Sequence, residues 1–385
     1  MEFEFKTSGK AWFGDHALEK AIPSICALGQ KALIVTGGHT LKTGAMDRLT
    51  ENLQTGGLTW EIFHEIGGEP TEEMIQKGAA LYRDSSCDMI IGLGGGSPLD
   101  SAKAIAVYAT DGTAFCRYGG QIPDRTYPPT VLIPTTAGTG SEATRFFCVT
   151  DTSTNEKLLL SGEALLPRIA IIDPTFTMTA PPAVTAATGM DALTHAIEAY
   201  TSRRSNPLTD LYATDAIKRV FQHLPITYHN GSDRIAREEL AIAAYEAGIC
   251  ISNASVTLVH GMSRPIGALF HVPHGMSNAM LITECLQFAS SGCIDRFGAL
   301  GRLIHAASPE ENDQHATEAF LCSLQRLCQT LEIPTLREYG IDEDEFIANS
   351  SKMATDALAS LSPANTIRPV SRENILEIYR KLWKR

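Results

Sequence analysis

The chain has 385 residues and a formal net charge of −12 at pH 7. Because a single hydrophobic core stops growing at roughly 250–300 residues, this length predicts two domains. The negative charge would repel nucleic-acid phosphates and anionic membrane headgroups, so we expect neither as a partner. The N-terminal residues lack a basic and apolar signal pattern, and no apolar run reaches 18 residues, which indicates a cytoplasmic protein.

The nine cysteines are an odd number and include no CxxC motif. This scattered distribution favours a reducing compartment over a disulfide framework or a metal site built from thiolates. We therefore expect the cysteines to behave as small buried hydrophobic residues.

The first half of the chain alternates short apolar runs with amphipathic stretches. Four apolar runs predict buried strands, and they lie at residues 31–38, 87–96, 130–140 and 168–174. Helical spacing at residues 44–57 and 71–86 predicts right-handed βαβ units and a mainly parallel sheet. We therefore predict an α/β domain over residues 1–180.

From Pro181 onward the chain consists of long, alanine-rich segments that are nearly free of β-branched runs. Such segments favour helices, so we predict an all-α domain over residues 181–385. Three prolines within residues 173–182 interrupt the preceding pattern and mark the boundary between the two domains.

A run of three glycines at residues 94–96 ends the second predicted strand and allows the backbone to approach a ligand closely. We expect Ser97 to be the N-cap of the next helix, with Pro98 at its first position and Asp100 three residues after the cap. A helix N-terminus attracts anions, so the motif predicts a phosphate site, although a ligand-free turn is the alternative. Neither the full dinucleotide fingerprint nor a P-loop is present.

A second loop of small polar residues, PTTAGTGSEATRF, covers residues 134–146. The hydroxyl groups of Thr135, Thr136, Thr139 and Ser141 surround two glycines there. Loops after neighbouring parallel strands meet at the edge where open α/β sheets bind ligands. The two loops therefore suit a pyrophosphate flanked by two nucleosides, and a surface loop without a ligand is the alternative.

One carboxylate and three imidazoles form a further candidate group. Asp191 and His195 are four residues apart on a predicted helix, so both side chains leave the same face. An isolated pair of this kind is more often a surface contact or an ordinary core histidine. However, two prolines and a glycine between His260 and His274 predict a turn that can return both histidines to one point. The four residues include no thiolate and suit a divalent ion such as Fe²⁺ or Zn²⁺.

Four segments, taken in this order and at these separations, resemble the iron-containing (group III) alcohol dehydrogenases. They read GGGSPLDSAKAIA, IPTTAGTGSEAT, ATGMDALTHAIEAYTS and VHGMSRPIGALFHVPHGMSNAML, and the resemblance runs from about residue 5 to the C-terminus. It implies a dinucleotide-binding α/β domain, a helical domain that binds metal and substrate, and a cleft between them. It also implies NAD(P)-dependent interconversion of a small alcohol and an aldehyde or ketone by a homo-oligomer, expected to be a dimer.

The resemblance assigns the site residues as follows. The family's metal ligands match Asp191, His195, His260 and His274. The residues expected to bind the cofactor are Gly37, Gly38, His39, Gly94, Gly95, Gly96, Ser97, Asp100, Thr135, Thr136, Thr139, Ser141 and Lys157. Four protein ligands leave room for a substrate oxygen as a fifth, which Fe²⁺ accepts more readily than a closed tetrahedral zinc site would. We therefore expect Fe²⁺ first and Zn²⁺ second.

Gly37 departs from the pattern of many NAD-using relatives, which carry an aspartate that would contact the ribose hydroxyls and repel a 2′-phosphate. The segment TGGHTLKTG at residues 36–44 resembles the version found in NADP-using relatives, with His39 as a phosphate partner. We therefore favour NADPH over NADH by a small margin. The alternative is that Gly37 only turns the chain, in which case both cofactors fit.

Arg264 is the second departure, because relatives often carry a histidine four residues after the third metal ligand. Arginine cannot relay a proton at neutral pH, but it can clamp a carboxylate, phosphonate or sulfonate, and Arg145 could add a second contact. The alternative is an arginine that pairs with a nearby acid and stabilises the turn. His271 could take over the proton relay or be an ordinary loop histidine. The substrate is therefore expected to be a small aldehyde or alcohol, which could carry an anionic tail.

Two other classes of function compete with this interpretation. One is a lyase related to dehydroquinate synthase, in which the nicotinamide is oxidised and reduced within one turnover. The residues of the four motifs argue against a lyase of this kind. The other is a non-catalytic metal-binding subunit, in which the intact four-ligand set would have no evident use.

Overall fold

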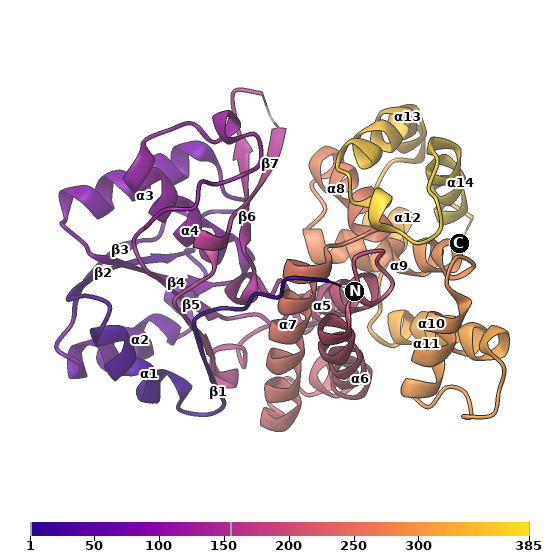
Figure 1. The fold of residues 1–385 in the computed structure, drawn as a ribbon, viewed down its shortest axis with the longest axis horizontal. Coiled ribbons are helices and arrows are strands. Elements are labelled where there is room, and N and C mark those ends of the chain that lie inside the picture. Colours follow the sequence, from indigo (N-terminus) through magenta and orange to yellow (C-terminus); the bar gives the residue numbers. More distant parts are fainter. Residues whose placement is uncertain (1, 155, 385) are drawn as a thin grey trace. The chain divides into compact units, whose positions relative to one another are not determined.

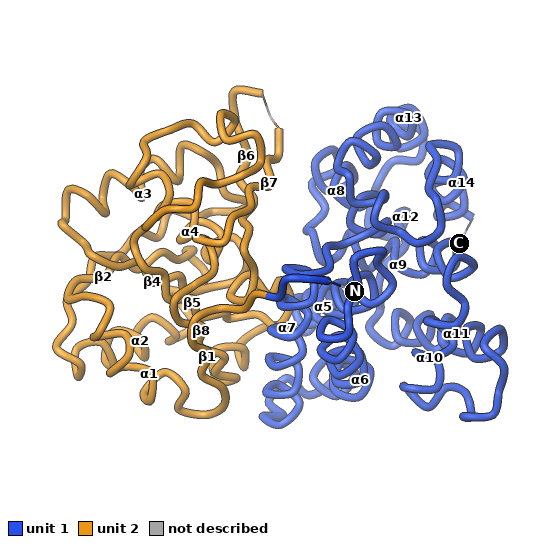
Figure 2. The backbone as a smooth tube through the Cα atoms, in the orientation of Figure 1, with its two compact units in different colours: residues 1–5, 181–385 blue, residues 6–180 orange. Residues whose placement is uncertain are grey.

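The computed structural model describes residues 2–154 and 156–384. The chain divides into two compact units, which Figure 2 shows in different colours. Lys6–Ala180 form an α/β unit, and Met1–Phe5 with Pro181–Arg385 form a helical unit. The predicted fold class, an α/β domain followed by an all-α domain, is confirmed.

A six-stranded parallel sheet forms the centre of the α/β unit (Figure 1). In spatial order the strands are β1 (Lys10–Phe13), β8 (Ile169–Ile172), β5 (Thr130–Pro134), β4 (Met89–Gly94), β2 (Lys31–Thr36) and β3 (Thr59–Phe63). All five pairings within this sheet are parallel. The strands β6 (Phe146–Asp151) and β7 (Glu156–Ser161) form a separate antiparallel hairpin. The four predicted strands are present, whereas β1, β3 and the hairpin were not predicted.

Helices cover both faces of this sheet. Buried residues of α1 (Ala17–Cys26) and α2 (Ala45–Thr55) pack on one face, and those of α3 (Glu72–Asp84) and α4 (Gly96–Asp111) pack on the other. Successive residues of β2 belong alternately to the two clusters, because neighbouring side chains of a strand point to opposite sides. Burial on both faces explains why the central strands read as continuous apolar runs.

The chain reverses its direction of travel across the sheet next to β2. From β2 it moves outward to β3, and it then returns to the other side of β2 as β4. Ligands of open parallel sheets bind at the carboxyl ends of the strands at such a point. The loops that follow β2, β4 and β5 therefore lie at the edge of the sheet where a cofactor is expected.

The helical unit is built around α5. Every residue of this helix from Gly189 to Ala199 is buried. The helices α6, α7 and α9 pack against α5, and α8 packs against α9. The α-helices of this unit are α5 (Pro182–Tyr200), α6 (Pro207–His229), α7 (Arg234–Ala254), α8 (Leu258–Phe270), α9 (His274–Ser290), α10 (Ile294–Leu303), α11 (Asp313–Thr330), α12 (Leu336–Tyr339), α13 (Glu343–Ala359) and α14 (Arg372–Leu382).

Within the described residues, no single helix has both the length and the hydropathy of a membrane span. The helices α7 and α8 meet that criterion only when they are taken together, across a bend of 103°. Both helices contribute many buried residues to the helical unit.

All nine cysteines are free. Four are buried as expected, namely Cys87, Cys250, Cys285 and Cys293. Cys116 and Cys322 are exposed and the remaining three are half-buried, so the expectation of general burial is wrong for these five. Each of the five lies on a helix or strand that presents part of its surface to solvent.

Candidate functional site

Helix α5 carries two of the candidate metal ligands on one buried face. Asp191 and His195 are one helical turn apart, and they are 2% and 4% exposed. Oδ1 of Asp191 lies 3.7 Å from Nε2 of His195. Polar groups buried this deeply are costly unless they have partners inside the protein, so the surroundings of this face decide its chemistry.

The other two candidate ligands come from α8 and α9. Nε2 of His260 lies 3.5 Å from Oδ1 of Asp191, and Nε2 of His274 lies 3.7 Å from the same oxygen. One ligand atom from each of the four residues, His195 included, lies within 4.8 Å of all the others. Three separate helices thus bring one carboxylate and three imidazoles to a single point.

The turn predicted between His260 and His274 lies near the end of the segment that joins them. Pro265 and Gly267 lie inside α8, which continues to Phe270, and the chain reverses only at residues 271–273. There His271 adopts a left-handed backbone with a φ of 54°, and Pro273 directly precedes α9. Packing of the buried α8 residues outweighs the roughly 3 kcal/mol that a proline costs inside a helix.

Two residues that were not predicted contact these ligands. Nδ1 of His260 lies 2.6 Å from Oε2 of Glu198, a residue that is fully buried. Nδ2 of Asn278 lies 2.7 Å from Oδ1 of Asp191. The same amide nitrogen lies 3.0 Å from Nε2 of His260 and 3.3 Å from Nε2 of His274. The available signal was their spacing, since Glu198 follows Asp191 by seven residues and Asn278 follows His274 by four.

Opposing influences act on the buried charges. Burial alone would raise the pKa of Asp191, but the imidazoles of His195, His274 and His260 hold it well below its usual range. Burial likewise works against the charged form of Glu198, yet His260 and the donors of Thr257 lower the pKa of this carboxyl. Both carboxyl groups are therefore ionised inside the helical unit.

The donor set fits a divalent cation. Oδ1 of Asp191 accepts hydrogen bonds, and an imidazole Nε2 without a proton does the same, so these atoms repel one another unless a cation or a donor lies among them. The Nδ2 group of Asn278 meets part of that need. Three nitrogens and a carboxylate oxygen, without a thiolate, are ligands that both Fe²⁺ and Zn²⁺ accept.

The glycine loop after β4 leads into α4 two residues earlier than predicted, and Pro98 is the third residue of the helix rather than the first. The helix begins at Gly96 with Gly95 as its cap, so Ser97 lies inside the first turn and the prediction that it is the N-cap is wrong. Pro98 is tolerated there because the first N–H groups of a helix have no partners within it. Gly94 has a φ of 152°, and a Cβ at this position would lie 2.7 Å from Cγ of Pro98, so glycine is required.

The loops after β2, β4 and β5 lie beside one another. A Cβ on Gly37 would lie 4.0 Å from Cγ of Pro98, and a Cβ on Gly96 would lie 2.7 Å from Cγ2 of Thr139. Thr136 lies beside Gly95, where an added Cβ would be 3.5 Å from Oγ1 of the threonine. The remaining candidates in these loops are Gly38 and His39, which are exposed, and Thr135, which is half-buried.

Asp100 and Lys103 of α4 hold the threonine loop in place. Oδ1 of Asp100 accepts a hydrogen bond from Oγ of Ser141 at 2.6 Å. Nζ of Lys103, which is 1% exposed, donates to the carbonyl groups of Ser141, Thr144 and Phe146 at 2.6–3.0 Å. Burial lowers the pKa of Lys103 to about 8. Sequence reasoning missed Lys103, although it follows Asp100 by three residues on the same face of the helix.

The other candidates of the α/β unit lie on and before the hairpin. Lys157, on β7, donates to Oε1 of Glu69 at 2.6 Å, and it is therefore engaged in an ion pair. Arg145 directly precedes β6 and is half-buried. Lys157 lies outside the loops after β2, β4 and β5, whereas Arg145 is the last residue of the segment that joins β5 to β6.

The remaining candidates of the helical unit lie close in sequence to the histidine ligands. Arg264 follows His260 by one turn of α8, and its Nη1 donates to Oγ of Ser362 at 2.9 Å. Across the described residues no carboxylate pairs with Arg264, so the expected alternative of a pairing with an acid is not found. His271 is exposed and ends α8.

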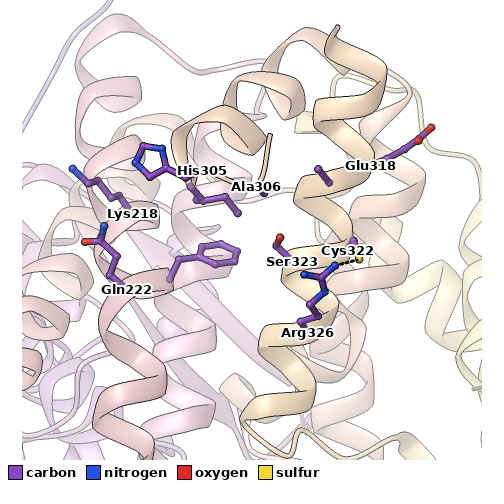
Figure 3. A pocket seen from close by; sticks show the side chains of 11 residues that line it. Lys218, Gln222, His305, Ala306, Glu318, Cys322, Ser323 and Arg326 are labelled. Atoms are coloured by element: carbon purple, nitrogen blue, oxygen red, sulfur yellow. Dashed lines mark hydrogen bonds between the residues drawn. The ribbon is translucent and has the colours of Figure 1, made fainter. Parts of the chain in front are cut away.

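A pocket of about 640 Å³ lies elsewhere in the helical unit (Figure 3). Lys218 and Gln222 of α6 lie on one side of it, and Ser323 and Arg326 of α11 lie on the other. None of the candidate site residues lines this pocket. It is therefore separate from the convergence of Asp191 and the three histidines.

Comparisons with known proteins cover nearly the whole chain. The model of a family described as "Iron-containing alcohol dehydrogenase" matches residues 8–174. A second model, "Fe-containing alcohol dehydrogenase family, C-terminal", matches residues 185–383. The two matches correspond to the α/β unit and the helical unit.

The chain is also similar to individual dehydrogenases and to a solved structure. The NAD-dependent methanol dehydrogenase of Bacillus methanolicus is 32% identical over 336 residues, which cover 87% of this chain and 88% of that protein. The NADPH-dependent butanol dehydrogenase of Clostridium saccharobutylicum is 33% identical over 368 residues and 91% of both chains. A crystal structure of 1,3-propanediol oxidoreductase matches with a TM-score of 0.96 and 33% identity, over 99% of this chain and 100% of that chain.

Replacing one histidine tests the four-ligand set. We expect His260→Ala to lower the affinity for Zn²⁺ or Fe²⁺ by at least about 100-fold, because one of four ligands is lost. The far-UV circular dichroism should stay unchanged, because the buried apolar residues of α5, α8 and α9 remain. Metal content after dialysis is the measurement. His305→Ala, which replaces an exposed histidine of the same unit, is the control. Full metal occupancy in His260→Ala would contradict the assignment.

Proposed function

Because the chain belongs to the iron-containing alcohol dehydrogenase family, we propose that it transfers a hydride between NAD(P) and a small alcohol or aldehyde with the help of a divalent metal. The observation that carries this proposal is the convergence of Asp191, His195, His260 and His274 within 4.8 Å in a buried setting. The donor set supports Fe²⁺ as the first choice and Zn²⁺ as the second. The relatives' names, methanol and butanol dehydrogenase, support a small alcohol as substrate.

The residues of each unit have distinct tasks in this proposal. A divalent ion in the helical unit would act as a Lewis acid toward the substrate oxygen. Asp191 supplies the one charged ligand, and it is buried together with His195 and His260. In the α/β unit, the first N–H groups of α4 and the hydroxyls of the threonine loop bind and orient the cofactor pyrophosphate.

An assay of cofactor turnover tests the proposed activity. Metal-loaded protein should oxidise NADH or NADPH in the presence of a small aldehyde such as butanal, in proportion to the aldehyde consumed. Removal of the metal with a chelator should abolish the reaction, and adding Fe²⁺ or Zn²⁺ should restore it. The absence of net cofactor oxidation with every aldehyde would contradict the proposal and favour a lyase that recycles its cofactor within one turnover.

The preference for NADPH rests on Gly37 at the end of β2. We expect Gly37→Asp to weaken NADPH binding at least about tenfold more than NADH binding, because a carboxylate there would face the 2′-phosphate. The dissociation constants of both cofactors, measured by fluorescence titration, give the comparison. Equal losses for the two cofactors would mean that residue 37 does not face the ribose.

A steric control is needed for this substitution. A Cβ at residue 37 would lie 3.0 Å from the carbonyl oxygen of Ile66, so any side chain requires a small shift. Gly37→Ala introduces the same Cβ without a charge. We expect it to change the binding of NADH and NADPH by similar factors, which isolates the electrostatic part of the aspartate effect.

We further infer that Arg264 favours substrates with an anionic tail. Its guanidinium has a hydroxyl partner and no carboxylate partner across the described residues, so its charge is available to an anion. A buried or half-buried charge pair that loses one partner costs about 2–5 kcal/mol. Arg264→Ala should therefore lower kcat/KM for an aldehyde with a sulfonate or carboxylate tail roughly 30-fold or more, and leave a neutral aldehyde of equal length nearly unchanged. A parallel loss for both substrates would assign Arg264 a structural role.

A further inference from the structure

Glu198 lies on the same face of α5 as two of the metal ligands. It follows Asp191 by seven residues and His195 by three, so the three side chains form one stripe along the helix. Glu198 is 0% exposed, and it has no cation of Lys or Arg beside it among its described contacts. Its charge is instead balanced by hydrogen-bond donors of the segment that begins α8.

The carboxylate of Glu198 caps α8 from a different helix. Its Oε1 accepts hydrogen bonds from the N–H of Val259 at 2.6 Å and from Oγ1 of Thr257 at 2.7 Å. Its Oε2 accepts from the N–H of Thr257 at 3.0 Å. Thr257 is the N-cap residue of α8, but its own side chain makes no capping hydrogen bond to the helix. Glu198 therefore performs the capping role that the N-cap side chain normally has.

The same carboxylate determines where the proton of His260 lies. Nε2 of His260 lies 3.0 Å from Nδ2 of Asn278, an amide nitrogen that can only donate, so Nε2 accepts and the proton of a neutral imidazole is on Nδ1. Nδ1 then donates to Oε2 of Glu198 across the contact of 2.6 Å. A neutral imidazole then has a lone pair on Nε2, the atom that faces Oδ1 of Asp191 at 3.5 Å. His260 is the third residue of α8, so the contact also fixes the rotation of its ring relative to the helix start.

From this geometry we infer that Glu198 is a positioning residue that holds His260 in the tautomer and orientation needed to bind the metal. The inference rests on the proposed metal site, because it describes how one of the four ligands is prepared for its ion. Carboxylate partners of ligating histidines raise metal affinity typically by 10- to 100-fold in proteins. Glu198 also connects α5 to α8, so that ligands from two helices keep a constant separation.

Glu198→Gln is the variant that tests this inference. The glutamine amide has a similar size, but its NH₂ group must replace one oxygen that accepts two hydrogen bonds. If that oxygen is the one beside His260, Nδ1 must become an acceptor and the proton moves to Nε2, the metal-facing atom. In the other orientation the partner of Nδ1 has lost its negative charge, and the imidazole becomes a weaker ligand. We expect the affinity for Zn²⁺, measured by competition with a chromogenic chelator, to fall 10- to 100-fold. An affinity equal to that of the wild type would overturn the inference.

Two matched variants separate positioning from general stability. Thr257→Val removes one hydrogen bond to Oε1 of Glu198 and leaves the contact with His260, so it should lower the melting temperature while Zn²⁺ affinity stays within about threefold. Glu246→Gln makes the same substitution in another largely buried side chain, on α7, away from the candidate metal site. Burial raises the pKa of this carboxyl to about 8, so the variant controls for the loss of a buried carboxyl group rather than for the loss of its charge. It should alter neither quantity. If Thr257→Val weakens Zn²⁺ binding as much as Glu198→Gln, Glu198 acts through stability alone and the inference is wrong.

A measurement on the unaltered protein covers the case in which Glu198→Gln does not fold. Ring-¹⁵N histidine labelling reports which nitrogen carries the proton, and the signal of His260 is the one that disappears in His260→Ala. We expect a protonated Nδ1 both without metal and with Zn²⁺ bound. A proton on Nε2 together with a bare Nδ1 would overturn the inference. If the wild type binds no metal at all, the proposed function fails, whereas metal binding with an unaffected Glu198→Gln variant contradicts only the role of Glu198.

Discussion

The helical unit depends on how the buried carboxylate of Asp191 is compensated. Its Oδ1 lies 3.5–3.7 Å from three imidazole nitrogens, in a core where unpaired charge is costly. These four side chains come from α5, α8 and α9, so a cation at their centre would connect three helices that are joined otherwise by apolar packing and a few hydrogen bonds. The amide of Asn278 and the carboxylate of Glu198 extend this polar cluster through the core. The same polar cluster therefore links these helices and forms the candidate metal site.

In the α/β unit, three loops rich in glycine and small polar residues are held together at one edge of the sheet. Close contacts between glycines and neighbouring side chains bring the loops together, as at Gly96 and Thr139. Lys103 then fixes the threonine loop from inside by donating to its carbonyl groups, which compensates for the cost of burying a lysine. Thr135, Thr136 and Thr139 of this loop are half-buried.

Sequence patterns were informative where burial is uniform. The strands β2, β4, β5 and β8 are buried on both faces, so each reads as an apolar run, and α5 to α14 follow from composition. The edge strands β1 and β3 are partly exposed and contain charged residues, which hid them. Glu198 and Lys103 were missed because a charged residue in a helix normally faces solvent, and spacing alone does not show that its partners lie on another segment. Ser97 was misplaced because the glycine before it can also begin a helix.

The two units keep their chemistry apart along the chain. The four residues that could hold a metal ion belong to residues 181–385, and the loops suited to a nucleotide belong to residues 6–180. The chain passes between the units near residues 5 and 180. A substitution in the loop after β2 leaves the polar core of the helices untouched, and a change around Asp191 leaves the loops intact. Selection can therefore act on each unit at its own rate. A lineage with this arrangement can exchange its electron carrier, or broaden the range of compounds it reduces, without rebuilding the other half of the enzyme.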